Sequence, residues 1–359
     1  MRLLATVAGI VLVALTLWDV FSIMVLTRRA NRQLQLSSFV VYRLRKVYIA
    51  AGRYIRDRTQ RENFLGIAGP LLLFVRFGVW SLIFILAYAL LQWGAGDHIA
   101  APEGGASFAT LLYYSGTTFF TVGLGDITPV AIWPRLLNVF EAGTGFLFLG
   151  LVISYLPAFY SDFARREARI SSLDAWAGSP PSAGEVLGRL GREQALPEIH
   201  SFLSNWENWA AETMESHLSY PILAAFRSQH EDQSWVSALA TVLDVSALVM
   251  VGIDGLNPRA ARLTFAMARH AAVDLSQIFG RPRHDGYADR LPSIELAQLR
   301  AYMSANGVTL AGGQAADARL AELRGLYEPY LEVLAEALFM PLPGWLPQAG
   351  ARDNWQRTA

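Results

Sequence analysis

The 359-residue sequence contains no cysteine. This absence excludes a disulfide framework, a thiolate metal site and a cysteine nucleophile. Charged residues are also scarce, at 17%, whereas 53% of the residues are hydrophobic, and the apolar excess lies mainly before residue 160. A membrane half followed by a soluble half is therefore the expected organisation.

Glycine-rich turns that bind nucleotides are missing as well. No lysine follows the glycines near residue 125, which excludes a phosphate-binding loop, and no glycine-rich turn follows a strand in the second half. The histidines lack the paired spacing of a zinc site, and no arrangement of nucleophile, base and oxyanion donors can be read. We therefore expect no enzyme, no cofactor and no nucleic acid partner.

Three apolar segments are long enough to cross about 30 Å of hydrocarbon as helices. They are residues 3–27, 70–92 and 136–160. A cleaved signal peptide is the alternative for the first, but no cleavage site is evident and positive charge follows the segment. Residues 28–61 hold ten arginines or lysines against one acid, which predicts a cytoplasmic loop and an external N-terminus.

Residues 37–58 have the pattern of a basic amphipathic helix, with Val40, Leu44 and Val47 on one face. Such a helix would lie on the inner leaflet, where anionic lipid attracts it. A solvated linker helix fits the same pattern, and both interpretations stay open.

Two charged residues, Asp19 and Arg76, fall inside the first and second apolar segments at similar depths. Unpaired charge at such depth is costly, so we predict an ion pair between them. The alternative is that each side chain extends to the interface separately.

The central motif runs from Thr117 to Pro129, in the pattern T-T-x-x-T-V-G-x-G-D-x-x-P. Gly123 and Gly125 permit dihedral angles that a residue with a Cβ resists. An extended backbone of this kind can aim successive carbonyl oxygens at one axis and replace the water shell of a cation. The motif resembles the selectivity filter of potassium channels, and is closest to the second-pore filters of two-pore-domain channels.

The resemblance implies that K⁺ is bound by the carbonyls of Thr121, Val122, Gly123 and Leu124 and by the Thr121 hydroxyl, with Gly125 completing the filter. Leu124 stands where most of the family carries tyrosine, so a weakly selective cation channel remains an alternative. Many members place an acid where this chain has Thr117, so Asp126 needs another partner, Tyr113 or Tyr114. The residues expected to support the filter are Thr117, Thr118, Asp126, Tyr113, Tyr114 and Glu141.

The third apolar segment has the features of an inner pore helix. Gly145 follows the filter at the spacing of the family's hinge glycine, and Gly143 and Gly150 flank it. Close packing of small residues is the alternative to a hinge. Pro157 is expected to end or kink this helix.

Beyond residue 161 the 3.6-residue periodicity dominates and predicts an all-α cytosolic domain. The expected helices are 185–205, 206–228, 234–251, 257–279, 293–305 and 315–339. Residues 235–253 are interrupted only by Asp244. They predict either the buried central helix of this domain or a fourth crossing.

The expected fold is thus an all-α membrane protein with four parts: 1–27, an N-terminal transmembrane helix; 28–66, a basic linker; 67–160, a potassium-channel pore domain; and 161–359, a helical cytosolic domain. One filter strand cannot surround an ion, so four chains must form a homotetramer. No apolar segment carries arginine at every third position, which excludes a voltage sensor. The expected function is passive, selective K⁺ conduction across the plasma (inner) membrane, with a ligand or protein bound by the cytosolic domain. A membrane-anchored sensor with a non-conducting pore is the alternative from another class.

Overall fold

The computed structural model describes residues 1–26, 36–96, 99–102, 104–230, 232–282, 288–348 and 350. It contains two compact units. The pore unit comprises Met1–Ala51 and Ile67–Ser161, and the helical unit comprises Gly52–Gly66 and Asp162–Ala359. The linker expected as one segment, 28–66, is thus divided between the units, and its residues 28–35 lie outside the described part.

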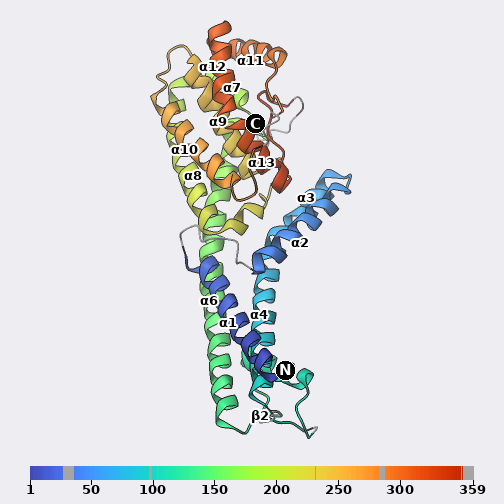
Figure 1. Ribbon diagram of the computed structural model, residues 1–359. Helices are drawn as coiled ribbons and strands as arrows, with labels where there is room; N and C mark the ends of the chain where they lie inside the picture. The colour runs from blue at the N-terminus through green and yellow to red at the C-terminus, as the bar shows by residue number, and fades with distance from the viewer. Residues whose placement is uncertain are drawn as a thin grey trace, which may run out of the picture. The chain divides into compact units, whose positions relative to one another are not determined.

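The chain folds almost entirely as helices, so it is an all-α membrane protein (Figure 1). Four stretches of the described chain are long and apolar enough to cross a membrane: Arg2–Met24, Arg58–Ala95, Ile132–Ala177 and Trp235–Gly252. The second and third contain the predicted segments 70–92 and 136–160, and the first covers the predicted segment 3–27 as far as Met24.

The helices of the pore unit are α1 (Arg2–Met24), α2 (Leu36–Arg53), α4 (Ala68–Ala95), α5 (Phe108–Phe119) and α6 (Ile132–Ala177). Strands β1 (Ile99–Ala100) and β2 (Thr128–Pro129) pair antiparallel on either side of α5 in the sequence. The last residues of α2 and α6 lie in the helical unit. The amphipathic helix predicted within 37–58 ends at Arg53, and a separate helix begins at Arg58.

Helix α1 packs closely along α4 (Figure 1). A Cβ on Gly9 would lie 2.7 Å from Cγ of Leu91, and a Cβ on Gly94 would lie 3.1 Å from Cβ of Thr6. Only glycine allows the two backbones this approach, which is the usual way in which helices associate in membranes. Helix α1 is therefore an integral part of the pore unit.

Helix α6 does not end at Pro157, where the sequence led us to expect an end or a kink, but continues to Ala177. Ile170, Leu173 and Ala177 on its later turns are buried in the core of the helical unit. A proline inside a helix removes one backbone hydrogen bond. Burial of these apolar side chains outweighs that loss, so the helix persists beyond the proline.

The helical unit contains α3 and α7–α13, with two short 3₁₀ helices. Their bounds are α3 (Arg58–Gly66), α7 (Ala183–Arg192), η2 (Leu196–Glu198), α8 (Ile199–Ser219), η3 (Pro221–Ala225), α9 (Trp235–Gly252), α10 (Arg259–Ser276), α11 (Ser293–Ala305), α12 (Gln314–Gly325) and α13 (Glu328–Leu338). The helix predicted over 315–339 is two helices, because the chain turns at Leu326 and Tyr327 and Pro329 starts the next helix. Pro197 and Pro221 likewise divide the two helices predicted over 185–228.

Helix α9 is the centre of this unit, in contact with α7, α8, α10, α12 and α13. Its single charged residue, Asp244, is fully buried. The carboxylate of Asp244 accepts hydrogen bonds from Arg290 at 2.6 Å and from the hydroxyl of Tyr327 at 2.6 Å. This is the arrangement expected of a buried central helix, because the acid has its partners inside the helical unit.

Candidate ion-conduction site

The motif that resembles a filter has a regular backbone alternation. Thr121, Gly123 and Gly125 have φ angles of 58°, 56° and 80°. The two glycines adopt this left-handed conformation readily, whereas a threonine does so at a cost of about 1–3 kcal/mol. Every second residue from Thr121 to Gly125 therefore has a left-handed backbone conformation, and the spacing of the two glycines predicts this alternation.

The C-terminal end of α5 fixes the first half of this segment. The carbonyl of Thr117 accepts hydrogen bonds from the backbone N–H of Val122 at 2.8 Å and of Gly123 at 3.2 Å, and the carbonyl of Thr118 accepts one from Thr121 at 2.9 Å. In a trans peptide the C=O points opposite to the N–H. The carbonyls of Thr121 and Val122 therefore point away from α5 and are free to meet a cation.

The two tyrosines expected to support the filter have different partners. The hydroxyl of Tyr113 donates to Oδ2 of Asp126 at 3.1 Å, so Tyr113 takes the place of the missing acid. The hydroxyls of Tyr114 and Thr118 both donate to Oδ1 of Asn138 on α6, at 2.7 and 2.9 Å. Asn138 thus joins α5 to the inner helix.

Asn138 was missed by the sequence analysis. The available signal was an amide at the start of an apolar helix, but its two partners lie 20 and 24 residues away along the chain.

Glu141 is fully buried and contacts Ser115 on α5. The hydroxyl of Ser115 also lies 2.8 Å from the carbonyl of Ile85 on α4. Three helices therefore meet at this hydroxyl. Because a hydroxyl has one proton to donate, a protonated Glu141 would donate to Ser115 and leave Ser115 free to bond Ile85.

The three glycines of α6 have unequal surroundings. A Cβ on Gly145 would overlap the carbonyl oxygen of Phe119 and lie 2.8 Å from its carbonyl carbon, whereas a Cβ on Gly143 or Gly150 would meet nothing within 4 Å. Gly145 therefore lets α6 approach the last residue of α5, directly before the filter. The hinge role of the three glycines stays a prediction.

Asp19 and Arg76 are both buried in the pore unit. Oδ2 of Asp19 accepts hydrogen bonds from the backbone N–H of Ser37 at 2.9 Å and from Nε1 of Trp80 at 3.1 Å. Arg76 lies one turn before Trp80 on α4, so Asp19 reaches the part of α4 that carries the arginine. The ion pair itself stays a prediction.

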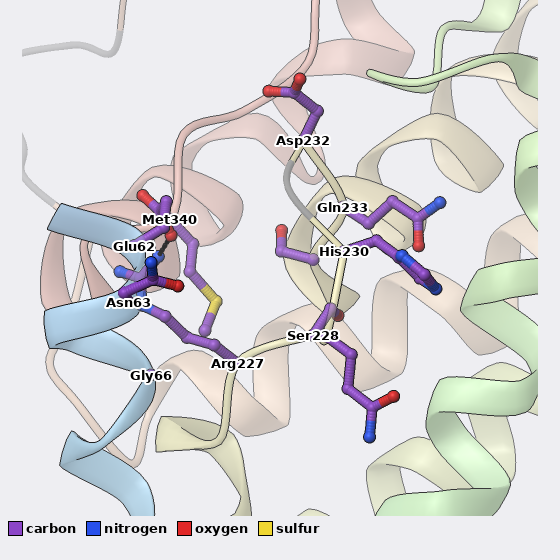
Figure 2. A pocket seen from close by; sticks show the side chains of 11 residues that line it. Glu62, Asn63, Gly66, Arg227, Ser228, His230, Asp232, Gln233 and Met340 are labelled. Atoms are coloured by element: carbon purple, nitrogen blue, oxygen red, sulfur yellow. Dashed lines mark hydrogen bonds and ion pairs between the residues drawn. The ribbon is translucent and has the colours of Figure 1, made fainter. Parts of the chain in front are cut away.

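A second candidate site is a polar pocket of about 270 Å³ in the helical unit, between α3 and the loop before α9 (Figure 2). Glu62 of α3 and Arg227 form an ion pair at its wall, and Met340 lies beside them. Arg227 also donates to the carbonyl of Phe339 at 2.6 Å. The remaining lining residues are Asn63, Gly66, Ser228, Gln229, His230, Asp232, Gln233 and Ser234.

Comparison with known proteins gives a family match over the pore. Residues 72–162 match a family model described as an ion channel. This stretch contains most of α4, all of α5 and the filter motif, and the first part of α6. Residues 72–162 therefore resemble the pore domain of the ion channel family, as the filter motif predicts.

A curated relative is the uncharacterized membrane protein YdjJ of Bacillus subtilis (strain 168). It is 23% identical over 195 residues, which are 53% of this chain and 55% of the relative. The match thus spans about half the length of each protein. No solved structure matches the chain.

Proposed function

We propose that the protein is a potassium-selective channel that conducts passively as a homotetramer. The observation that carries the proposal is the backbone at Thr121–Gly125, which is reversed at every second residue and directs the carbonyls of Thr121 and Val122 away from α5. Carbonyl oxygens arranged in a ring replace the hydration shell of K⁺. The K⁺ ligands in this proposal are the carbonyls of Thr121, Val122, Gly123 and Leu124.

The tetramer and the topology belong to the same proposal. One chain supplies one filter strand, and the side chains of Val122 and Leu124 are more than half exposed in the single chain, which fits a surface completed by other subunits. The basic linker favours a cytoplasmic position. We place the helical unit in the cytoplasm and the pore in the plasma membrane.

The test is the reversal potential of purified protein in a planar bilayer with potassium on one side and sodium on the other. We expect a value near the potassium equilibrium potential. Gly123→Ala should abolish this selectivity, because alanine resists the φ angle of 56°. Gly78→Ala on α4 is the matched control, since a Cβ there meets nothing within 4 Å in the chain and no role in conduction is assigned to Gly78.

A reversal potential near zero would favour the second candidate, a weakly selective cation channel. Leu124 is the observation behind it, because leucine lacks the hydroxyl that usually braces the filter. In that case Leu124→Tyr should move the reversal potential toward potassium. Absence of current from protein that is correctly inserted would favour a sensor with a non-conducting pore.

Two partners complete the proposal. Helix α2 carries Arg43, Arg45 and Lys46, and Val47 on the same helix is exposed, which suits contact with anionic lipid. Flux in vesicles with and without phosphatidylserine tests this contact. A polar ligand of the helical unit has room in the pocket beside Glu62 and Arg227.

A further inference from the structure

The N-terminal helix α1 contains a buried acidic residue, Asp19, which a helix that only anchors the chain in a membrane would not need. Asp19 is completely buried, and its Oδ2 accepts hydrogen bonds from two other helices of the pore unit. A charged side chain inside a membrane segment is costly and is usually kept for a function. These two contacts join α1 to α2 and to α4.

The first contact is with the start of α2. The backbone N–H of Ser37, in the first turn of this 18-residue helix, donates to Asp19 at 2.9 Å. The first N–H groups of a helix have no partner within the helix and carry partial positive charge. Asp19 therefore acts as an N-cap for α2, although it belongs to helix α1.

The second contact is with the outer helix of the pore. Nε1 of the fully buried Trp80 on α4 donates to the same oxygen of Asp19 at 3.1 Å. Both partners are donors, and a carboxyl oxygen has two lone pairs with which it can accept from both. A single oxygen of α1 thus joins the start of α2 to α4.

The packing of α1 makes this junction rigid. Gly9 and Gly94 let α1 and α4 pack closely, which holds Asp19 against α4. The hydroxyl of Ser37 makes no hydrogen bond to any described residue, so the backbone N–H is what connects α2 to Asp19.

We propose that Asp19 is a positioning residue that fastens the basic amphipathic helix α2 to the outer pore helix α4. Helix α1 then serves as a coupling element: a displacement of α2 at the membrane surface is passed to α4 through Asp19. The consequence for gating rests on the proposed channel function, whereas the junction itself does not.

Electron paramagnetic resonance tests the junction without any current. The chain has no native cysteine, so spin labels at Val47→Cys on α2 and Phe74→Cys on α4, two exposed positions, report their distance alone. Labelled chains are diluted with unlabelled ones to suppress distances between chains. Asp19→Leu and Ser37→Pro should both broaden the distance distribution, because each removes the hydrogen bond between Asp19 and α2, and loss of one such bond shifts an equilibrium about fivefold or more.

The variant Ser37→Pro tests the contact with α2 directly, because proline is tolerated in the first turn of a helix and lacks the N–H that donates to Asp19. Ser37→Ala keeps the N–H and is its matched control, with a wild-type distribution expected. Trp80→Phe removes the second donor, and Trp18→Phe, at an exposed position beside Asp19, is the control for it. Ser37→Pro decides the question if Asp19→Leu fails to insert.

A positioning role also predicts that Ser37→Pro adds nothing in the Asp19→Leu background, which loss of stability alone would not produce. In bilayers both variants should change how open probability depends on anionic lipid and leave the reversal potential unchanged. Unaltered distance distributions in Asp19→Leu and Ser37→Pro would overturn the proposal. A reversal potential near zero in the wild type would overturn potassium selectivity and leave the junction standing.

Discussion

At the scale of single residues, the glycines of the inner helix α6 differ in what surrounds them. Gly145 faces the carbonyl of Phe119 at the end of α5, whereas Gly143 and Gly150 face open space in the single chain. The filter begins two residues after Phe119. A change at Gly145 therefore acts on the backbone that positions the filter.

We predict that Gly145→Ala lowers the stability of the pore unit by about 1–3 kcal/mol, the usual cost of overpacking, and reduces conduction. Gly150→Ala should be neutral or slightly stabilising, because alanine favours a helix by about 1 kcal/mol over glycine. Thermal unfolding in detergent and single-channel recording measure the two effects. Equal behaviour of the two variants would show that α6 does not depend on this close contact.

At the scale of elements, α3 is held in the helical unit by charge. Glu62 pairs with Arg227, Arg58 pairs with Asp232, and Arg53 and Arg61 both lie 5.6 Å from the ring of Phe339. Phe339 itself has a φ of 55°, a conformation that costs a non-glycine residue free energy. These contacts hold α3 within the helical unit.

We predict that Glu62→Gln speeds amide hydrogen exchange of α3 about tenfold, because it removes a charged partner from the nearly buried Arg227. The control is Glu322→Gln, which breaks the ion pair with Arg319, whose side chains are 48% and 62% exposed. Such surface pairs contribute about 0–1 kcal/mol, so exchange in α12 should hardly change. Unchanged exchange in α3 of Glu62→Gln would argue that its apolar contacts suffice.

At the scale of the whole molecule, the helical unit encloses an ion network instead of a purely apolar core. Asp244 and Glu328 face Arg290 and Arg324, and the ring of Trp345 lies 5.7 Å from both guanidinium groups. Burial raises the pKa of Glu328 to about 7, with Asp244 adding to the rise and the two arginines opposing it. Glu328 therefore takes up a proton within the physiological pH range.

Because the pKa of Glu328 is higher in the folded than in the unfolded protein, its protonated form is favoured by folding. The stability it contributes is complete below about pH 4.5 and is lost as the pH rises to about 7, with a slope of about 1.4 kcal/mol per pH unit. We predict that Glu328→Gln removes this part of the pH dependence. Denaturant unfolding of the wild type and the variant from pH 5 to 8 measures it, and parallel curves would refute the assignment.

The sequence by itself determined the pore. The three apolar segments follow from hydrophobicity, and the T-V-G-x-G-D motif follows from local backbone freedom. Gly123 and Gly125 predicted the positive φ angles at their positions. Local signals could not give Asn138 or the hydrogen bonds of Asp19 with Ser37 and Trp80, because the contacting groups come from separate helices. Only the tertiary structure decided that α6 continues past Pro157 and that α9 is covered by helices of its own unit. An apolar sequence shows only that a helix is kept from water. The tertiary packing determines whether other helices or lipid surround it.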